Sequence, residues 1–334
     1  MTTQVFVLGN SRSGTTMLAR ILSSGSEAAD LRELHFIEQM ITGQEFNSPA
    51  SLPTDRAETL ATHLISVIRD GYFRGKADTR YLNEAKSLVT ERMSAAELFQ
   101  AVRLYETTRL GRSIPIDQTP RNVFYIPDIL NAYDTARIVC MVRDPRDVCL
   151  SQKGKWRRRF LGADIPLRES IRSWANYHPL VTAKIWASAV RAGDKSAHDP
   201  RVLIVKFEDI ALDPEMTIRN VCTHCGITFD PEMLNVKQLG SSDRKDQAEK
   251  TGVDASRVGT WEKALSGAEI SIIEKEVGEL LTAYGYKLSE KKADMGSSLL
   301  WMLVLAPKMG LSLLLNLNRV KSLSAWARKR LVQA

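Results

Sequence analysis

The chain has only four cysteines among its 334 residues, and no second pair of metal ligands accompanies the two that lie close together. Cys222 and Cys225 form a C-x-x-C motif around His224, which taken alone allows a redox pair or half of a metal site. Because the surrounding stretch has helical periodicity, we interpret both cysteines as small apolar residues on the buried face of a helix. The sequence therefore predicts no metal, and its cysteine content is typical of a reducing compartment.

Acidic residues are absent from Arg319 to the C-terminus, where the sequence has five cations: Arg319, Lys321, Arg328, Lys329 and Arg330. The net charge is +7, so the rest of the chain has a surplus of only two positive charges. A surplus this small argues against nucleic acid as a partner. The N-terminal residues have no charged region or cleavage site of a secretory signal, since a strand is predicted from about Gln4. We therefore expect a cytoplasmic protein.

Short apolar runs alternate with helical patterns through the first two-thirds of the chain. Buried strands are predicted at 5–8, 114–116, 137–142 and 202–205, and helices at 15–22, 54–68, 95–110, 147–152, 167–190 and 214–225. Thr54 is the expected cap of the second helix. Alternation of this kind predicts an α/β fold with a mostly parallel central sheet and right-handed crossovers.

A phosphate-binding loop follows the first predicted strand. Residues 9–16 match the pattern G-x-x-x-x-G-K-[ST], except that Thr15 stands where nucleoside triphosphatases have lysine. Backbone N–H groups and the start of the next helix still bind a phosphate. The missing lysine would have contacted the β- and γ-phosphates, so the loop favours a nucleotide with a 5′-phosphate and no triphosphate. Its predicted ligand-binding residues are Ser11, Arg12, Ser13, Gly14, Thr15 and Thr16.

Two further segments contain candidate anion-binding residues. Arg143 ends the apolar strand 137–142, and Ser151 follows about two helical turns later, so the two side chains are predicted to hold one phosphate. Local ion pairs within Arg143-Asp144 and Arg146-Asp147 are the alternative. Arg257 and Gly259 are predicted to offer a guanidinium and a backbone N–H to the same anion, the alternative being a solvent-facing arginine.

Together these segments resemble the sulfotransferases that use 3′-phosphoadenosine 5′-phosphosulfate (PAPS). Residues 11–16 resemble their 5′-phosphosulfate loop, with Ser11 in place of a proline found in the bacterial and tyrosylprotein-type branch. The stretch from Arg143 to Ser151 is similar to their 3′-phosphate motif, and 257–261 to their C-terminal cofactor segment. The resemblance extends over about 4–285, and 117–122 and 205–214 also match. It implies a three-layer α/β/α fold of the P-loop nucleotide-hydrolase type.

The resemblance also implies roles for single residues. Glu33 matches the family's catalytic base, and His35 is the second candidate because imidazole titrates near neutral pH. The alternative is that Glu33 pairs with Arg32 or Arg121 while His35 fills a polar niche. Arg12 is expected to stabilise the leaving 5′-phosphate. The remaining cofactor contacts implied are Arg143, Ser151, Phe207, Arg257, Val258 and Gly259.

Two departures from the family pattern affect the catalytic details. Gln118 stands where many relatives have a lysine, and Arg12, Arg121 or Lys153 are candidates to replace that charge. Phe207 replaces a frequent tyrosine near the adenine, which keeps a ring but loses a hydroxyl.

The C-terminal region differs in composition from the rest. Residues 299–306 are uninterrupted apolar residues, Pro307 and Lys308 interrupt them, and 309–317 resume the pattern. We expect a sulfotransferase domain over 1–290 and a helical appendage over 291–334. The interruptions argue against a membrane-spanning helix. The alternatives for 297–330 are a kinked segment at the inner membrane surface, or a helix packed on the body or on a second subunit in a homodimer.

The expected activity is in-line transfer of a sulfuryl group from PAPS to a hydroxyl of a small molecule, sugar or lipid. Adenosine 3′,5′-bisphosphate (PAP) is the product, and no metal is required. A lipid-linked acceptor follows if the membrane interpretation holds. Two alternatives remain: a P-loop kinase, which the missing lysine disfavours, and a catalytically silent nucleotide-binding protein at a membrane.

Overall fold

The computed structural model describes residues 2–71, 78–162, 165–236, 251–291 and 295–316. These residues form two compact units. The first consists of Met1–Met141 and Ala192–Val236, and the second of Val142–Arg191 and Lys237–Ala334. Of the predicted appendage 291–334, the structure describes residue 291 and residues 295–316, so the cationic tail from Arg319 lies outside the described residues.

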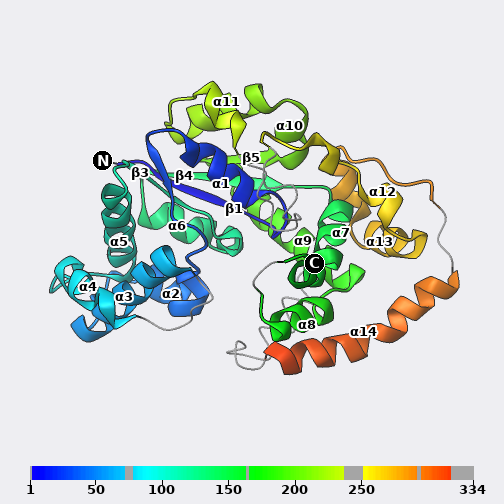
Figure 1. The fold of residues 1–334 in the computed structure, drawn as a ribbon, viewed down its shortest axis with the longest axis horizontal. Helices are drawn as coiled ribbons and strands as arrows, with labels where there is room; N and C mark the ends of the chain where they lie inside the picture. Colours follow the sequence, from blue (N-terminus) through cyan, green and yellow to red (C-terminus); the bar gives the residue numbers. More distant parts are fainter. Residues whose placement is uncertain (1, 72–77, 163–164, 237–250, 292–294, 317–334) are drawn as a thin grey trace. The chain divides into compact units, whose positions relative to one another are not determined.

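A five-stranded sheet in the order β2-β3-β1-β4-β5 forms the centre of the fold (Figure 1). Its strands are β1 (Gln4–Gly9), β2 (Ala28–Asp30), β3 (Ile114–Asp117), β4 (Ala136–Val142) and β5 (Val202–Lys206). Strand β1 pairs in parallel with β3 and β4, and β2 pairs in parallel with β3. Every residue of β1 is buried, as expected for a strand covered on both faces. The predicted α/β class and parallel sheet are confirmed, although β2 was not predicted.

Helices of the first unit cover both faces of this sheet. Figure 1 shows α10 (Phe207–Leu212) and α11 (Pro214–Cys225) above it, and α5 (Ala95–Arg109) and α6 (Ile126–Ala132) below it. Cys222 and Cys225 are buried on α11, so their predicted position on the buried face of a helix is confirmed. Burial raises the pKa of the Cys222 thiol to about 11.

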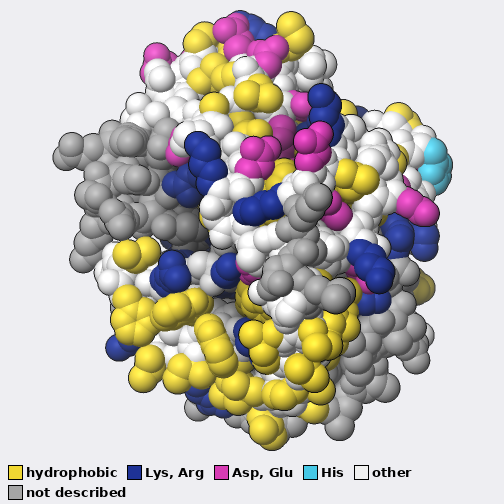
Figure 2. Space-filling model, turned by 90° about the vertical axis from the view of Figure 1, so that its right-hand side faces the viewer, with side chains coloured by type: hydrophobic (Ala, Val, Ile, Leu, Met, Phe, Trp, Pro, Cys, Tyr) yellow, Lys and Arg dark blue, Asp and Glu magenta, His cyan; other side chains and the backbone are white. Residues whose placement is uncertain are grey.

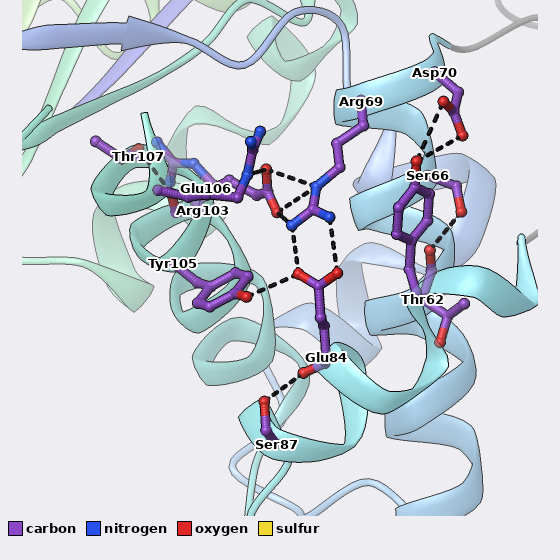
Figure 3. Close-up of polar contacts among 12 residues, drawn as sticks. Thr62, Ser66, Arg69, Asp70, Glu84, Ser87, Arg103, Tyr105, Glu106 and Thr107 are labelled. Atoms are coloured by element: carbon purple, nitrogen blue, oxygen red, sulfur yellow. Dashed lines mark hydrogen bonds and ion pairs between the residues drawn. The ribbon is translucent and has the colours of Figure 1, made fainter. Parts of the chain in front are cut away.

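Three helices of the first unit are joined by a partly buried ionic network, which we call the Arg69 network (Figure 3). They are α3 (Thr54–Asp70), α4 (Leu82–Leu88) and α5. The Arg69 guanidinium donates to Glu106 at 2.6 Å and to Glu84 at 2.6 and 2.9 Å, and Tyr105 also donates to Glu84. Glu106 is fully buried, so its charge depends on these partners.

The start of α3 differs from the prediction. Pro53 occupies the cap position and Thr54 is already the first helical residue, without a capping hydrogen bond. A side chain caps a helix only from the non-helical residue that precedes it, so the predicted role of Thr54 is wrong.

The second unit is mostly helical. Its helices are α7 (Pro145–Gly154), α8 (Leu167–Ala175), α12 (Trp261–Ala264), α13 (Gly267–Ala283) and α14 (Met295–Asn316), and α9 (Pro179–Asp194) begins in it. The 3₁₀ segment η5 (Lys155–Leu161) connects α7 to α8. The single helix predicted over 167–190 is wrong, because the chain leaves helical geometry between Ala175 and Pro179. Proline disfavours helical backbone in the residue that precedes it, which accounts for a break here.

Candidate active site

The phosphate-binding loop lies where open α/β sheets bind ligands. Strand β1 is at the centre of the sheet, with β3 and β2 on one side of it and β4 and β5 on the other. The strand order therefore reverses at β1, and ligands bind at the carboxyl end of the strands at such a point. The loop follows β1 directly and ends at α1 (Thr15–Ser24). The segments that follow β2 and β3 belong to the same edge, and they contain Glu33, His35 and Gln118.

The loop needs glycine at both ends. Gly9 has φ +132°, and a Cβ there would lie 2.2 Å from the carbonyl oxygen of Met141. Gly14 has φ +93°, and a Cβ there would lie 2.7 Å from the ring of Phe207. Arg12 also has a positive φ of 77°, which costs energy for a residue with a side chain. Phe207 is therefore a wall of the loop, in addition to its predicted contact with adenine.

The loop fits a phosphate group. Helix α1 starts after Gly14 without a side-chain cap, so the N–H groups of its first turn, from Thr15 and Thr16, are suited to an anion. The Ser13 hydroxyl is buried and has no hydrogen-bond partner among the described residues. An unsatisfied buried hydroxyl costs about 1–3 kcal/mol, which a ligand oxygen would recover. Ser11 is exposed and Arg12 half-buried at the rim.

A chain of polar contacts links the loop to the predicted base. Gln118 Nε2 donates to Thr15 Oγ1 at 3.2 Å and lies 3.5 Å from Glu33 Oε1. The other carboxylate oxygen of Glu33 lies 3.1 Å from His35 Nε2. We call Thr15, Glu33, His35 and Gln118 the Glu33 cluster. Both candidate bases thus belong to one cluster, and the neutral Gln118 bridges it to the loop.

Exposure distinguishes the two candidate bases. The Glu33 side chain is 44% exposed and the His35 side chain 13% exposed. A base must reach the proton of an acceptor that arrives from solvent, which favours Glu33 for this role. His35 then orients the carboxylate.

The end of β3 positions this segment. Thr119 Oγ1 accepts from the N–H groups of Leu34 and His35, and it donates to Asp117 at 2.6 Å. Burial raises the pKa of Asp117. Arg32 and His35 have positive φ values of 68° and 50°, and together with Arg12 they are the non-glycine residues with positive φ in the described ranges. Backbone strain thus concentrates in the loop and in the Glu33 segment, which is typical of functional sites.

In the second unit, Arg143 and Arg257 lie next to each other. The Arg143 side chain is almost fully buried, and its Nη2 donates to the backbone carbonyl of Arg257 at 2.8 Å. The backbone carbonyl of Arg143 accepts from the indole of Trp186 at 2.8 Å. Arg257 Nε donates to Asp254 at 3.1 Å. The structure therefore brings together one residue of the predicted 3′-phosphate motif and one of the predicted C-terminal cofactor segment, while Ser151 lies on α7.

Asp147 holds the segment 257–261 against α7. Its buried carboxylate accepts from the N–H of Gly259 at 2.8 Å, the hydroxyl of Thr260 at 2.8 Å and the N–H of Trp261 at 3.0 Å. The Gly259 N–H, which was predicted to donate to an anion, donates to Asp147 in this structure, and Val258 and Gly259 stay predicted cofactor contacts. The sequence did not predict that Asp147 positions this segment. The only signal in the sequence was an acidic residue in the first turn of a predicted helix.

The ion pair that the structure shows at the start of α7 joins Arg146 to Asp144, and not to Asp147 as the local ion-pair alternative had it. Arg146 pairs with Asp144 at 2.7 Å and with Glu274 at 2.7 Å, and it stacks on Trp261 at 3.7 Å. It is buried, so it fixes the start of α7 and faces no solvent. Lys153, one candidate to replace the missing lysine, pairs with Glu269 at 2.8 Å.

The model of the sulfotransferase family matches residues 4–231. The chain belongs to the sulfotransferase family. The segment 257–259 and helix α14 lie beyond the matched range.

Curated relatives match over part of their length. Carbohydrate sulfotransferase 5 of Mus musculus is 28% identical over 45% of this chain and 42% of its own. Sulfotransferase 2A1 of Homo sapiens is 24% identical over 43% of this chain and 48% of its own. These matches thus span about half the length of each relative.

Solved structures share the fold. The sulfotransferase domain from the olefin synthase of Synechococcus PCC 7002 superimposes with a TM-score of 0.53 and 18% identity, over 86% of this chain and 96% of that domain. The expected sulfotransferase fold is therefore confirmed.

Proposed function

We propose that this protein transfers a sulfuryl group from PAPS to a hydroxyl group of an acceptor and releases PAP. The observation that carries the proposal is the bridge from the phosphate loop to a partly exposed carboxylate, through Thr15, Gln118 and Glu33. A loop without the triphosphatase lysine, placed beside a carboxylate base, suits transfer from a nucleotide that has a 5′-phosphate and no triphosphate.

We assign the ends of the donor to separate residues. The loop from Ser11 to Thr16 would hold the 5′-phosphosulfate, and its buried Ser13 hydroxyl supports this assignment. Arg143 and Ser151 would hold the 3′-phosphate, as the resemblance implies. Phe207 would contact the adenine, and residues 257–259 would complete the nucleotide site.

In the proposed reaction each residue has a distinct task. PAPS supplies the sulfuryl group, bonded through oxygen to its 5′-phosphate. Glu33 accepts the proton of the acceptor hydroxyl, and His35 orients that carboxylate. Arg12 and the N-terminus of α1 stabilise negative charge at the 5′-phosphate. Gln118 contributes a neutral hydrogen bond where many relatives have a cation.

For the acceptor we propose a hydroxyl of a sugar, a small molecule or a lipid-linked compound. The similarity to carbohydrate sulfotransferase 5 supports a sugar as the acceptor. The exposed hydrophobic residues of η5, α8 and α14 favour an acceptor located at a membrane.

The test is thermal unfolding with PAP, with ATP and Mg²⁺, or with AMP. PAP at a hundred times its Kd should stabilise the protein by about 2.7 kcal/mol, and the other two should have little effect. Arg143→Ala and Ser151→Ala should each reduce the response, whereas Arg219→Ala and Ser87→Ala, at exposed positions of α11 and α4, should not.

Other outcomes would contradict the proposal. Stabilisation by ATP and Mg²⁺ in place of PAP would indicate a kinase. Binding of PAP without turnover of PAPS on any hydroxyl acceptor would indicate a silent nucleotide-binding protein.

A further inference from the structure

Helix α14 has its polar and apolar sides reversed relative to a helix on the surface of a water-soluble protein. Its exposed residues are all apolar or glycine, and Leu299, Leu300, Leu303 and Leu314 are each more than 60% exposed. Its charged residue, Lys308, is half-buried, and Ser312 is buried. A surface helix in water normally shows the opposite arrangement.

The polar side of α14 is fixed to the second unit by specific contacts. Lys308 donates to the backbone carbonyl of Tyr177 at 2.9 Å and lies 4.5 Å from the ring of Trp174. Burial lowers the pKa of Lys308. One and two turns further along the helix, Ser312 and Asn316 both donate to the side chain of Asn176. Spacings of four residues place all three on one face.

Pro307 lies inside helix α14, which continues on both sides of it. Trp301 before the proline, and Lys308 and Ser312 after it, all contact the segment 174–178. The backbone carbonyl of Trp301 lies 2.8 Å from His178 Nε2, and its ring contacts that of Tyr177 edge-on.

The outward leucines belong to a larger apolar face. Of the fifteen large hydrophobic residues that are exposed in the described ranges, eleven lie in η5, α8 and α14. On α8 they are Leu167, Ile171 and Trp174, which form one stripe along the helix. Figure 2 shows these hydrophobic side chains as a broad yellow area over the lower part of the molecule, with dark blue basic side chains next to it.

Positive charge accompanies this apolar face. From Lys153 to Arg172 the sequence has seven basic and two acidic residues, and four of the basic residues lie in η5, which packs on α8. A cavity of about 410 Å³ beneath α14 is lined by Trp156, Trp174, Tyr177, Trp301 and the cations Lys153, Arg157 and Lys308. Tryptophan, tyrosine and basic residues together are characteristic of the interface between membrane and water.

We propose that the outward face of α14 and the apolar stripe of α8 dock in the plane of an anionic lipid bilayer, with the cations of η5 at the headgroups. By length and composition α14 could also cross a membrane. Spanning would, however, move Lys308 from its carbonyl partners into hydrocarbon. A second copy of the chain is disfavoured as the partner, because it would bring two basic surfaces together.

The test is flotation of the full chain with vesicles of phosphatidylcholine, with or without phosphatidylglycerol. The wild-type protein should float with the phosphatidylglycerol vesicles and bind the neutral vesicles several-fold less. Leu303→Gln with Leu314→Gln should weaken binding about ten- to a hundredfold. The matched control is Leu212→Gln with Met216→Gln, two residues of similar exposure outside this face, which should bind as wild type does.

Several results would overturn the proposal. They are a wild-type protein that does not float, a Leu303/Leu314 variant that floats as well as wild type, or a lipid-bound protein that resists alkaline extraction as a spanning helix would. A dimer in lipid-free buffer that the Leu303/Leu314 variant dissociates would assign the face to a second copy. The thermal response to PAP serves as the folding control for both variants, so failure of docking and failure of the proposed activity are distinguishable.

Discussion

The Arg69 network and the Glu33 cluster are two groups of polar side chains in the same unit, and they are built differently. In the network, the Arg69 guanidinium bonds to two carboxylates, and Glu106 is fully buried (Figure 3). In the cluster, Glu33 is 44% exposed and its contacts are 3.1 and 3.5 Å long. Of these two groups, only the Glu33 cluster lies in a segment with non-glycine residues of positive φ, namely Arg32 and His35.

This difference separates a structural role from a chemical one. A buried carboxylate whose partners neutralise its charge stabilises the packing of three helices and has no capacity left for a ligand. A carboxylate that is held in place by strained backbone and open on one side can exchange a proton with an acceptor. The comparison therefore predicts that changes in one group alter the rate and changes in the other alter stability.

The largest effect is expected from Glu33→Gln. The amide preserves the shape of the side chain but cannot accept the acceptor's proton, so turnover should fall by about 10²–10⁴. The melting temperature and the response to PAP should stay near the wild-type values. Steady-state rates with PAPS and a hydroxyl acceptor check this expectation. If Glu33→Gln kept its rate and His35→Gln lost it, His35 would be the base.

Arg69→Met should instead affect stability. It leaves the buried Glu106 with Arg109 as its remaining ion-pair partner, so the free energy of unfolding should fall by about 2–4 kcal/mol. Denaturant titration measures this change. The control is Arg80→Met, which removes a 64% exposed side chain from a surface ion pair and should cost about 0–1 kcal/mol. Equal losses in the two variants would contradict the assigned role of the network.

The smallest expected effect is on the free energy of unfolding at acidic pH. Arg69 and Tyr105 lower the pKa of Glu84 from 4.5 to about 2. The stabilisation from its charged form is therefore complete above pH 4.5 and is lost as the pH falls from 4.5 towards 2. In Glu84→Gln this part of the decline should disappear, so its unfolding free energy should depend less steeply on pH in that range. An unchanged slope would show that Glu84 is not held as described.

The sequence alone was sufficient to predict those parts of the site that are contiguous in the chain. Strand β1, the loop and α1 follow one another in the chain. The apolar run, the spacing of the glycines and the start of the helix could therefore each be predicted from neighbouring residues. The same holds for β3, β4 and β5 and for the buried cysteines of α11. Strand β2 has three residues, too few for a recognisable pattern, and the break before Pro179 was hidden by apolar periodicity on both sides.

The contacts that organise the site join residues that are far apart in the sequence. Gln118 reaches Thr15 across 103 positions of sequence, and Asp147 reaches Gly259 across 112. No local pattern encodes such pairs, because they depend on which strand ends and helices the fold brings together. The reversed orientation of α14 is equally non-local, since its composition showed an apolar helix but not which side would face the protein.

The sequence by itself determined the parallel α/β fold, the phosphate loop without its lysine, and the family, because each depends on neighbouring residues and on apolar periodicity. Tertiary structure alone decided that Glu33 and His35 share one cluster, that Asp147 anchors the 257–261 segment, and that α14 turns its leucines outward. Each of these depends on partners far apart in the chain, whose meeting is set by packing and by the satisfaction of buried polar groups.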